Sequence, residues 1–322
     1  MTILDVRNLS VDYETEQGTL RALRDVSFTI EDNKIVGVVG ESGCGKSTLI
    51  SSIINLLANN AVLSSGEIIF QGKDIVRLSE DEMRDILGVG VSIIFQDPMQ
   101  THNPVLTVGR QMMDIQYRDK TSKEKKKEAA IDMLRVVGIP DPESRLSQYP
   151  HEFSGGMRQR IAIAMALMVK PSLLIADEPT TALDATLEVQ IIEKLRELQG
   201  KINCSILFIS HHLGVIAELC DEVIVMYAGE IVEHGDVRDV FHNARHPYTQ
   251  ALFACDPGRI KEKSKNLPTI KGSIPNLIDL PSGCIFKHRC TQRISVCDTS
   301  PAMHRVSEKQ QAKCHLLTQG KN

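Results

Sequence analysis

Residues 40–48 read GESGCGKST and have the composition of a loop that binds phosphate. The spacing Gly40-x-x-x-x-Gly45-Lys46-Ser47 fits the phosphate-loop pattern without a mismatch. Glycines let the backbone curl until successive N–H groups face an anion. The Lys46 ammonium can then reach the β- and γ-phosphates, while the Ser47 hydroxyl can ligate Mg²⁺. The nucleotide-binding residues that we expect in this loop are Gly40, Ser42, Gly43, Cys44, Gly45, Lys46, Ser47 and Thr48.

Polar side chains also end two apolar runs further along the chain. Asp177 and Glu178 follow the run at 173–176, where they can bind Mg²⁺ and polarise water beside a phosphate loop. A purely structural role is disfavoured, because burying two carboxylates without partners costs free energy. Gln96 ends the run at 91–95, where its amide can ligate Mg²⁺, hold the attacking water, or bond to the backbone.

A second anion-binding pattern is Ser154-Gly155-Gly156, which precedes a helical, alanine-rich segment at 161–169. Two such patterns in one chain indicate either two bound anions or one nucleotide shared across a dimer. His211 follows another apolar run, at 205–209. Tyr13 lies before the phosphate loop and can either stack on a base or fill a half-buried strand position.

Strands and helices must alternate to position these residues. Residues 35–39 and 49–54 flank the phosphate loop as strand and helix. Residues 1–34 alternate apolar and polar side chains around Gly18, which predicts an antiparallel hairpin. Residues 107–170 have helical patterns, with Thr121 expected to cap one helix and Ala129 expected on its apolar stripe. This order predicts an α/β fold with a largely parallel sheet.

Composition places the chain among ordinary globular proteins. It has 322 residues, 42% of them hydrophobic, and a net charge of −4, so the basic surplus typical of nucleic-acid binders is absent. No apolar run approaches the roughly 20 residues that span a bilayer, and the N-terminus lacks a secretory signal pattern. We therefore expect a cytoplasmic chain that does not itself cross the membrane.

Four of the eight cysteines crowd the last forty residues. Disulfides are rare in a reducing cytosol, so this group suggests a metal site. Four thiolates suit an iron–sulfur cluster or tetrahedral Zn²⁺, although the close C-x₂₋₄-C pairs of zinc sites are absent. Reduced free thiols are the remaining alternative. The expected ligands are Cys284, Cys290, Cys297 and Cys314.

Residues 1–255 resemble the nucleotide-binding subunits of ABC transporters. In this family an aspartate usually follows the switch histidine, to which His211 corresponds. This chain has His212 at that position instead. The matching motifs are Tyr13 as the adenine-stacking aromatic, GESGCGKST as Walker A, Gln96 as the Q-loop glutamine, FSGGMRQR at 153–160 as the signature, LLIADEP at 173–179 as Walker B, Ala182-Leu183-Asp184 as the D-loop and His211 as the switch histidine.

Further segments resemble the dipeptide/oligopeptide/nickel permease branch of that family. These are Met157, the segment His246-Pro247-Tyr248-Thr249 and the tail at 272–290. Within the branch, the tail resembles the D-type ATPase subunit of dipeptide permeases, which favours a [4Fe–4S] cluster over Zn²⁺ at the four cysteines.

The resemblance implies a P-loop NTPase core with an antiparallel β subdomain. It also implies a helical subdomain at about 97–170 and a Cys-rich C-terminal extension at 256–322. ATP and Mg²⁺ would be cofactors, with Ser47, Gln96 and Asp177 around the ion. Glu178 would be the general base, and His211 would orient water. The Ser154-Gly155-Gly156 segment of one chain would close over ATP held by another.

The implied function is ATP hydrolysis that energises uptake of di- or oligopeptides. The implied partners are a second ATPase subunit (a paralogue is favoured over an identical copy), two membrane-spanning permeases that face residues 96–117, and a periplasmic binding protein, without nucleic acid. The chain would lie at the cytoplasmic face of a bacterial inner membrane. Alternatives are a nickel or glutathione importer and a non-transport ABC ATPase. The last usually has two cassettes or long coiled-coil insertions, which this sequence lacks.

Overall fold

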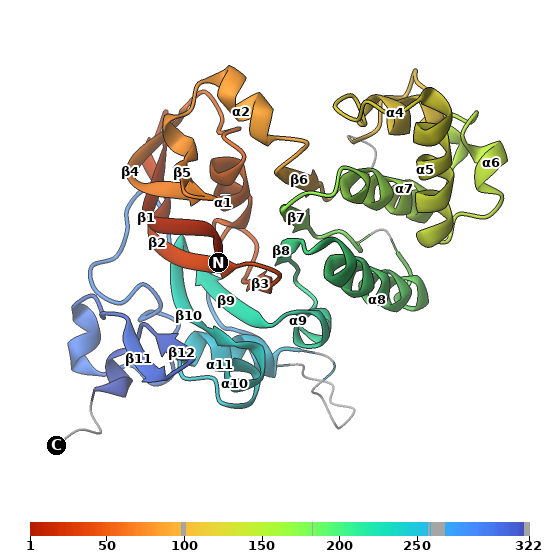
Figure 1. Ribbon diagram of the computed structural model, residues 1–322. Coiled ribbons are helices and arrows are strands. Elements are labelled where there is room, and N and C mark those ends of the chain that lie inside the picture. The colour runs from red at the N-terminus through yellow and green to blue at the C-terminus, as the bar shows by residue number, and fades with distance from the viewer. Residues whose placement is uncertain (98–100, 182, 257, 259–267, 319–322) are drawn as a thin grey trace. The chain divides into compact units, whose positions relative to one another are not determined.

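The computed structural model of the protein describes residues 1–97, 101–181, 183–256, 258 and 268–318 (Figure 1). The chain divides into two compact units. Unit 1 consists of residues 1, 31–34 and 78–208, and unit 2 consists of residues 2–30, 35–77 and 209–322.

The first sheet of unit 2 has the strand order β2-β1-β4-β5. Glu16 and Gln17 join the neighbouring strands β1 and β2, which confirms the predicted hairpin near Gly18. Strand β1 runs antiparallel to β4, with Leu4 opposite Phe70. The strands are β1 (Thr2–Thr15), β2 (Gly18–Glu31), β4 (Ala61–Phe70) and β5 (Lys73–Asp74), followed by the 3₁₀ turn η1 (Ile75–Arg77).

The second sheet of unit 2 has the order β11-β12-β10-β9-β3. Strand β3 (Ile35–Val39) is buried along its whole length and pairs parallel with β9 (Glu222–Tyr227). Strands β10 (Glu230–Asp236), β12 (Gln310–Ala312) and β11 (His304–Ser307) follow as antiparallel neighbours. Strands β12 and β11, shown in blue, therefore extend this sheet beyond β10 (Figure 1).

Helices and short 3₁₀ turns complete unit 2. Helix α9 packs against β3, and α10 and α11 pack against β10. These elements are α1 (Lys46–Ile53), α9 (Leu213–Leu219), α10 (Val237–His242), α11 (Pro247–Ala254), η4 (Ser295–Asp298) and η5 (His315–Leu317).

Unit 1 contains strands β6 (Val91–Ile94), β7 (Leu173–Asp177) and β8 (Ser205–Ile209), in the order β8-β7-β6. Strands β6 and β7 pair parallel, with Val91 opposite Leu173. The parallel pairs β3–β9 and β6–β7 agree with the predicted sheet. Helix α2 (Glu80–Ile86) begins at a capping box formed by Ser79 and Glu82, and α8 (Ala185–Ile202) follows β7 in the chain.

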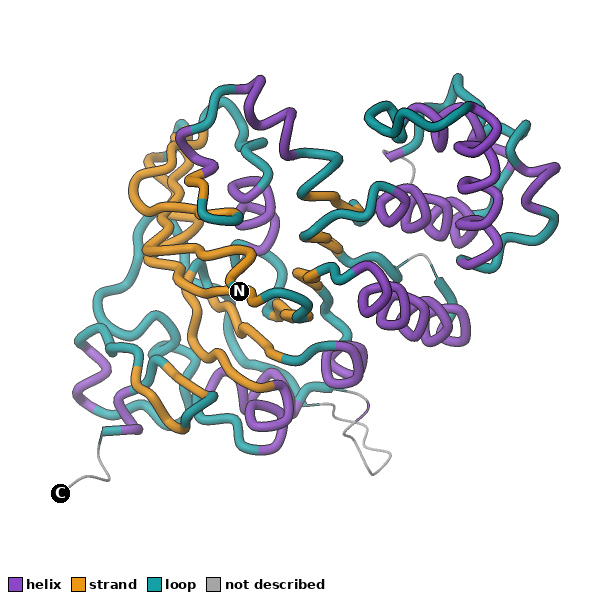
Figure 2. Tube along the Cα trace, in the orientation of Figure 1, coloured by secondary structure: helices purple, strands orange, loops and turns teal. Residues whose placement is uncertain are grey.

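The segment after β6 is mostly helical, as Figure 2 shows in purple. Helix α5 contacts α4, α6 and α7. Two details of the prediction for α5 were wrong. Its N-cap is Ser122 rather than Thr121, because the Ser122 hydroxyl accepts the Lys125 N–H, and Ala130 is buried where Ala129 was expected. The helices are α4 (Val108–Asp114), α5 (Lys123–Val136), α6 (Pro142–Arg145), η2 (Pro150–Glu152) and α7 (Gly155–Met168).

No helix in the described ranges combines the length and the apolar character that crossing a bilayer requires.

Helix α11 begins at a buried histidine. The Nδ1 atom of His246 accepts the Tyr248 N–H at 3.0 Å and so caps the helix. Burial lowers the pKa of His246 from 6.5 to about 3, with a smaller contribution from the charge of Lys313. The imidazole is therefore neutral in the folded protein at physiological pH.

We expect this histidine to make the protein less stable in mild acid. Between about pH 3 and 6.5 the unfolded chain binds a proton at His246 that the folded chain does not, so the free energy of unfolding falls as the pH falls. The slope from this residue approaches about 1.4 kcal/mol per pH unit. In His246→Asn, whose amide oxygen can still cap the helix, denaturant titrations from pH 7.5 to 5 should give a smaller slope. Parallel slopes for the two proteins would refute this assignment.

Candidate functional site

The loop at 40–48 joins β3 to α1, as predicted. Two of its glycines are sterically required. A Cβ atom on Gly40 would collide with the carbonyl oxygen of Met226. Gly45 has φ +109°, and a Cβ atom there would lie 2.8 Å from the side chain of Leu23. Close packing against strands of unit 2 therefore fixes the course of the loop.

Lys46 folds back over this loop. Its Nζ donates to the carbonyl oxygens of Gly40 at 2.7 Å and Glu41 at 3.1 Å, and lies 3.6 Å from the sulfur of Cys44. Cys44 is buried, and burial raises the pKa of its thiol. The Cys44 carbonyl accepts the Gly229 N–H at 2.9 Å. The Lys46 ammonium can thus donate to an anion bound at the loop in place of the two carbonyl oxygens.

Glu41 is not among the residues predicted from the sequence, yet it has the most specific side-chain contact of the loop. Two nitrogens of Arg289 donate to its carboxylate, at 2.7 and 3.0 Å. Its own N–H donates to the Tyr248 hydroxyl at 3.0 Å. A signal was present in the sequence, because a carboxylate inside an anion-binding loop needs a cation to neutralise it.

Tyr13 lies beside the loop. Its hydroxyl is 3.3 Å from the Thr48 hydroxyl, and its ring is half-buried on β1. It is therefore a half-buried strand tyrosine whose position also suits a nucleotide held by the loop.

Gln96 and Glu178 come together in unit 1. The Gln96 side-chain nitrogen donates to the Glu178 carboxylate at 3.0 Å. Glu178 has φ +45°, a left-handed backbone that costs a residue other than glycine roughly 1–3 kcal/mol and clusters at functional sites. Asp177 is the last residue of β7, immediately before it. The acidic pair therefore stands at the carboxyl end of a buried strand, as predicted.

The Ser154-Gly155-Gly156 segment forms the start of α7. The Ser154 hydroxyl accepts the Met157 N–H at 3.3 Å, and Gly155 has open space where a side chain would be. This helix start is uncrowded by side chains and has the geometry that binds anions. Asp184 caps α8 by accepting the N–H groups of Thr186 and Leu187. Ala182 of the D-loop motif lies outside the described residues, as do residues 98–100 after Gln96.

His211 follows β8 and is exposed. Its ring meets that of His212 edge-on, with centroids 4.3 Å apart. The His212 N–H donates to the Ser210 hydroxyl at 3.0 Å. His212 is thus anchored through its backbone, and its ring packs on His211.

The prediction of a metal site at the four late cysteines is not supported. Nowhere in the described parts of the chain do three His, Cys, Asp or Glu side chains gather as metal ligands. Cys284, Cys297 and Cys314 are buried, and the Cys284 N–H donates to the Cys297 carbonyl at 2.9 Å. Burial, with smaller contributions from neighbouring thiols, raises the pKa of Cys284 to about 11 and also raises those of Cys290 and Cys314. Burial therefore keeps the Cys284, Cys290 and Cys314 thiols neutral at physiological pH.

The candidate residues divide between the two units. Unit 2 holds the phosphate loop, Tyr13 and His211, and unit 1 holds Gln96, Asp177, Glu178 and the start of α7.

The fold and these residues define a phosphate-loop ATPase of the ABC class. Residues 23–181 match the ABC transporter family, and residues 232–297 match the oligopeptide/dipeptide transporter C-terminal region. The chain belongs to the family of ABC transporter ATP-binding proteins, in the branch that carries this C-terminal region.

Two relatives from Bacillus subtilis (strain 168) match almost the whole chain. The dipeptide transport ATP-binding protein DppD is 47% identical, over 98% of this chain and 95% of the relative. The oligopeptide transport ATP-binding protein OppD is 45% identical, over 98% of this chain and 89% of the relative. Among solved structures, the ATP-binding cassette MJ0796, a dimer in a post-hydrolysis state with ADP and Pi, has a TM-score of 0.66 and 26% identity, covering 73% of this chain and 99% of the cassette.

Proposed function

We propose that this chain is the ATP-hydrolysing subunit of a bacterial ABC importer for di- or oligopeptides. The observation that carries the proposal is the combination of an ABC cassette with the C-terminal region of oligopeptide/dipeptide transporters, in a chain nearly half identical to DppD and OppD along its length. The same combination argues against a non-transport ABC ATPase.

ATP binds at the phosphate loop in this proposal. The N–H groups of residues 40–48 and the Lys46 ammonium hold the phosphates, and Tyr13 stacks on the base. Mg²⁺ would be held by Ser47, Gln96 and Asp177, whose oxygen atoms are the ligands this ion prefers, and would neutralise charge on the phosphates. Two observations support this proposal: close packing at Gly40 and Gly45 fixes the path of the loop, and the Tyr13 hydroxyl lies beside Thr48.

Glu178 takes the proton from the attacking water. Gln96 orients this carboxylate through its hydrogen bond, and the left-handed backbone at Glu178 fixes the direction from which the carboxylate approaches. His211 orients the water and the γ-phosphate. Each of these roles uses a side chain at the carboxyl end of a strand, where α/β proteins bind their ligands.

A second ATPase chain completes each site. The start of α7, with Ser154, Gly155 and Gly156, covers the γ-phosphate of ATP held by the other chain. The uncrowded helix start supports this role, and the similar cassette MJ0796 was solved as a dimer. We favour a paralogue over an identical copy as the partner.

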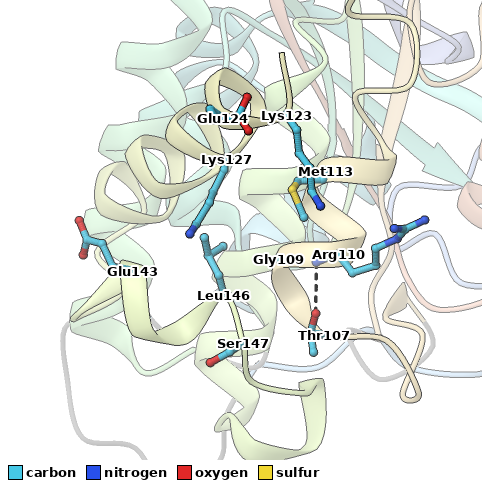
Figure 3. A pocket seen from close by; sticks show the side chains of 10 residues that line it. All are labelled: Thr107, Gly109, Arg110, Met113, Lys123, Glu124, Lys127, Glu143, Leu146 and Ser147. Carbon is cyan, nitrogen blue, oxygen red and sulfur yellow. Dashed lines mark hydrogen bonds between the residues drawn. The ribbon is translucent and has the colours of Figure 1, made fainter. Parts of the chain in front are cut away.

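Two permeases and a periplasmic binding protein supply the membrane path and the substrate, without nucleic acid. The chain then lies peripherally at the cytoplasmic face of the inner membrane. We propose that the permeases contact the region around α4, where a pocket of about 630 Å³ is lined by side chains from α4, α5 and residues 143–147 (Figure 3). Its lining includes Arg110 and Met113, which are residue types enriched at protein interfaces, together with Lys127 and Leu146.

The domain boundaries belong to the same proposal: an ATPase domain at 1–255, with a helical subdomain at about 97–170, and an extension at 256–322. The proposed [4Fe–4S] cluster, with Zn²⁺ as its alternative, rests on the donor set of four cysteines and enters no step above. Anaerobic purification with iron and zinc analysis tests it. About four irons per chain with a broad visible absorbance would support the cluster, and neither metal would end the idea.

Reconstitution tests the transport function. The chain is placed in proteoliposomes with candidate permeases, a second ATPase and a binding protein from the same organism, and uptake of a labelled dipeptide is measured with ATP. We expect uptake that requires ATP and the binding protein. Uptake of nickel or glutathione instead, under the same conditions, would favour the alternative importers. If no combination of these partners changed the rate of ATP hydrolysis, that result would contradict a transport function.

A further inference from the structure

The phosphate loop contains an acidic residue that ATP binding does not need. Glu41 follows Gly40 directly, and Lys46 donates to its carbonyl oxygen. A carboxylate turned toward the phosphates would repel them and would compete for the Lys46 ammonium. The loop can therefore function only if this side chain is neutralised or held elsewhere.

Arg289, which lies 248 residues later in the chain, both neutralises the Glu41 carboxylate and holds it in place. Its two terminal nitrogens donate to the two carboxylate oxygens of Glu41 at 2.7 and 3.0 Å, the paired geometry of a strong ion pair. The Arg289 side chain is only 5% exposed, against 27% for Glu41. This mostly buried ion pair therefore differs from the exposed ion pairs of the surface, which contribute little to stability.

Hydrogen bonds and a contact with an aromatic ring hold the guanidinium of Arg289 in place. Its Nε donates to the Lys271 carbonyl at 3.0 Å, and Nη2 donates to the Ile270 carbonyl at 3.2 Å. Nη1 donates to the Tyr227 hydroxyl at 3.3 Å, and the cation lies 5.7 Å from the centre of that ring. With all these contacts, the cation is held at one place and can direct the Glu41 side chain.

The backbone of Glu41 is fixed from the same direction. Its N–H donates to the hydroxyl of Tyr248, which is fully buried and packs its ring against Tyr227 at 4.6 Å. Both halves of Glu41 are therefore held by residues after β9, outside the phosphate-loop motif.

From this geometry we infer that Arg289 is a positioning residue for the phosphate loop: it neutralises Glu41 and holds its carboxylate away from the bound phosphates. The inference rests on the proposed ATP site. Arg289 needs no contact with nucleotide, because it acts through Glu41. The C-terminal extension thereby becomes part of the machinery that binds ATP.

The test measures ATP affinity and steady-state hydrolysis for the full chain in its complex. In Arg289→Ala the Glu41 carboxylate is unpaired, so we expect the KM and Kd for ATP to rise about tenfold while kcat at saturating ATP changes less than about twofold. Glu41→Gln should remain within about threefold of the wild type. The double variant should recover most of the affinity lost in Arg289→Ala, because the repelling charge has gone.

Arg293→Ala is the matched control. Arg293 lies in the same extension, is 43% exposed and pairs with Asp298, so its loss should leave ATP affinity unchanged. The inference is overturned if Arg289→Ala behaves like this control, or if the double variant is as weak as Arg289→Ala. The second outcome would mean that Arg289 supports only the fold.

Arg289→Lys replaces Arg289→Ala if the latter does not fold. Lysine keeps the charge but loses the paired geometry, so affinity should fall about threefold and should again recover with Glu41→Gln. A wild-type protein that does not bind ATP at all would instead refute the proposed function, which keeps the two failures distinct.

Discussion

Replacing Glu178 with glutamine should strongly slow ATP turnover while leaving ATP binding intact. Glutamine has nearly the same shape, so the left-handed turn after β7 and the contact with Gln96 can persist in altered form. The amide cannot accept the proton of the attacking water. Loss of a general base typically slows a reaction by about 10²–10⁴-fold, and we expect a decrease in that range.

Phosphate release measures the turnover of this variant, and titration with a fluorescent ATP analogue measures its binding. Glu193→Gln makes the same chemical change on an exposed position of α8 in the same unit, and should hydrolyse ATP within about twofold of the wild type. Turnover of Glu178→Gln within tenfold of the wild type would remove Glu178 from its role.

Lys46→Ala should weaken ATP binding by about 100-fold. In the structure the ammonium donates to two loop carbonyls, at 2.7 and 3.1 Å, and ATP is expected to take over these donors. Two hydrogen bonds to a charged partner contribute about 1.5–3 kcal/mol each, of which the lost carbonyl contacts offset part, so about 3 kcal/mol or 100-fold remains.

Isothermal titration with MgATP measures this loss. Lys73→Ala, on the exposed strand β5 of the same unit, is the control and should bind ATP as the wild type does. If Lys46→Ala retained wild-type affinity, the loop at 40–48 would not be the phosphate site.

Local sequence patterns predicted the elements that present the site. The strand, glycine loop and helix at 35–53 and the helix that follows the Ser154-Gly155-Gly156 pattern each depend on residues a few positions apart. The error at α5 has the same local origin. Thr121 with Glu124 matched the capping-box pattern, but the hydroxyl that caps the helix is that of Ser122, which accepts the Lys125 N–H.

Long-range contacts could not be predicted in this way. Strands β11 and β12 are only a few residues long. Strand β12 pairs with β10, more than seventy residues earlier, and β11 pairs with β12. The contact of Arg289 with Glu41 joins residues 248 positions apart. Four cysteines close in sequence suggested a metal site, whereas the described residues contain no group of three or more metal-binding side chains.

The central claim is that two ATPase chains enclose each nucleotide. The most direct measurement is a structure of the complex containing Glu178→Gln, determined with bound MgATP. We expect one ATP between residues 40–48 of one chain and the Ser154-Gly155-Gly156 segment of the other. If both surfaces of a single chain bound the same ATP, or if the start of α7 pointed away from every nucleotide, the claim would be wrong.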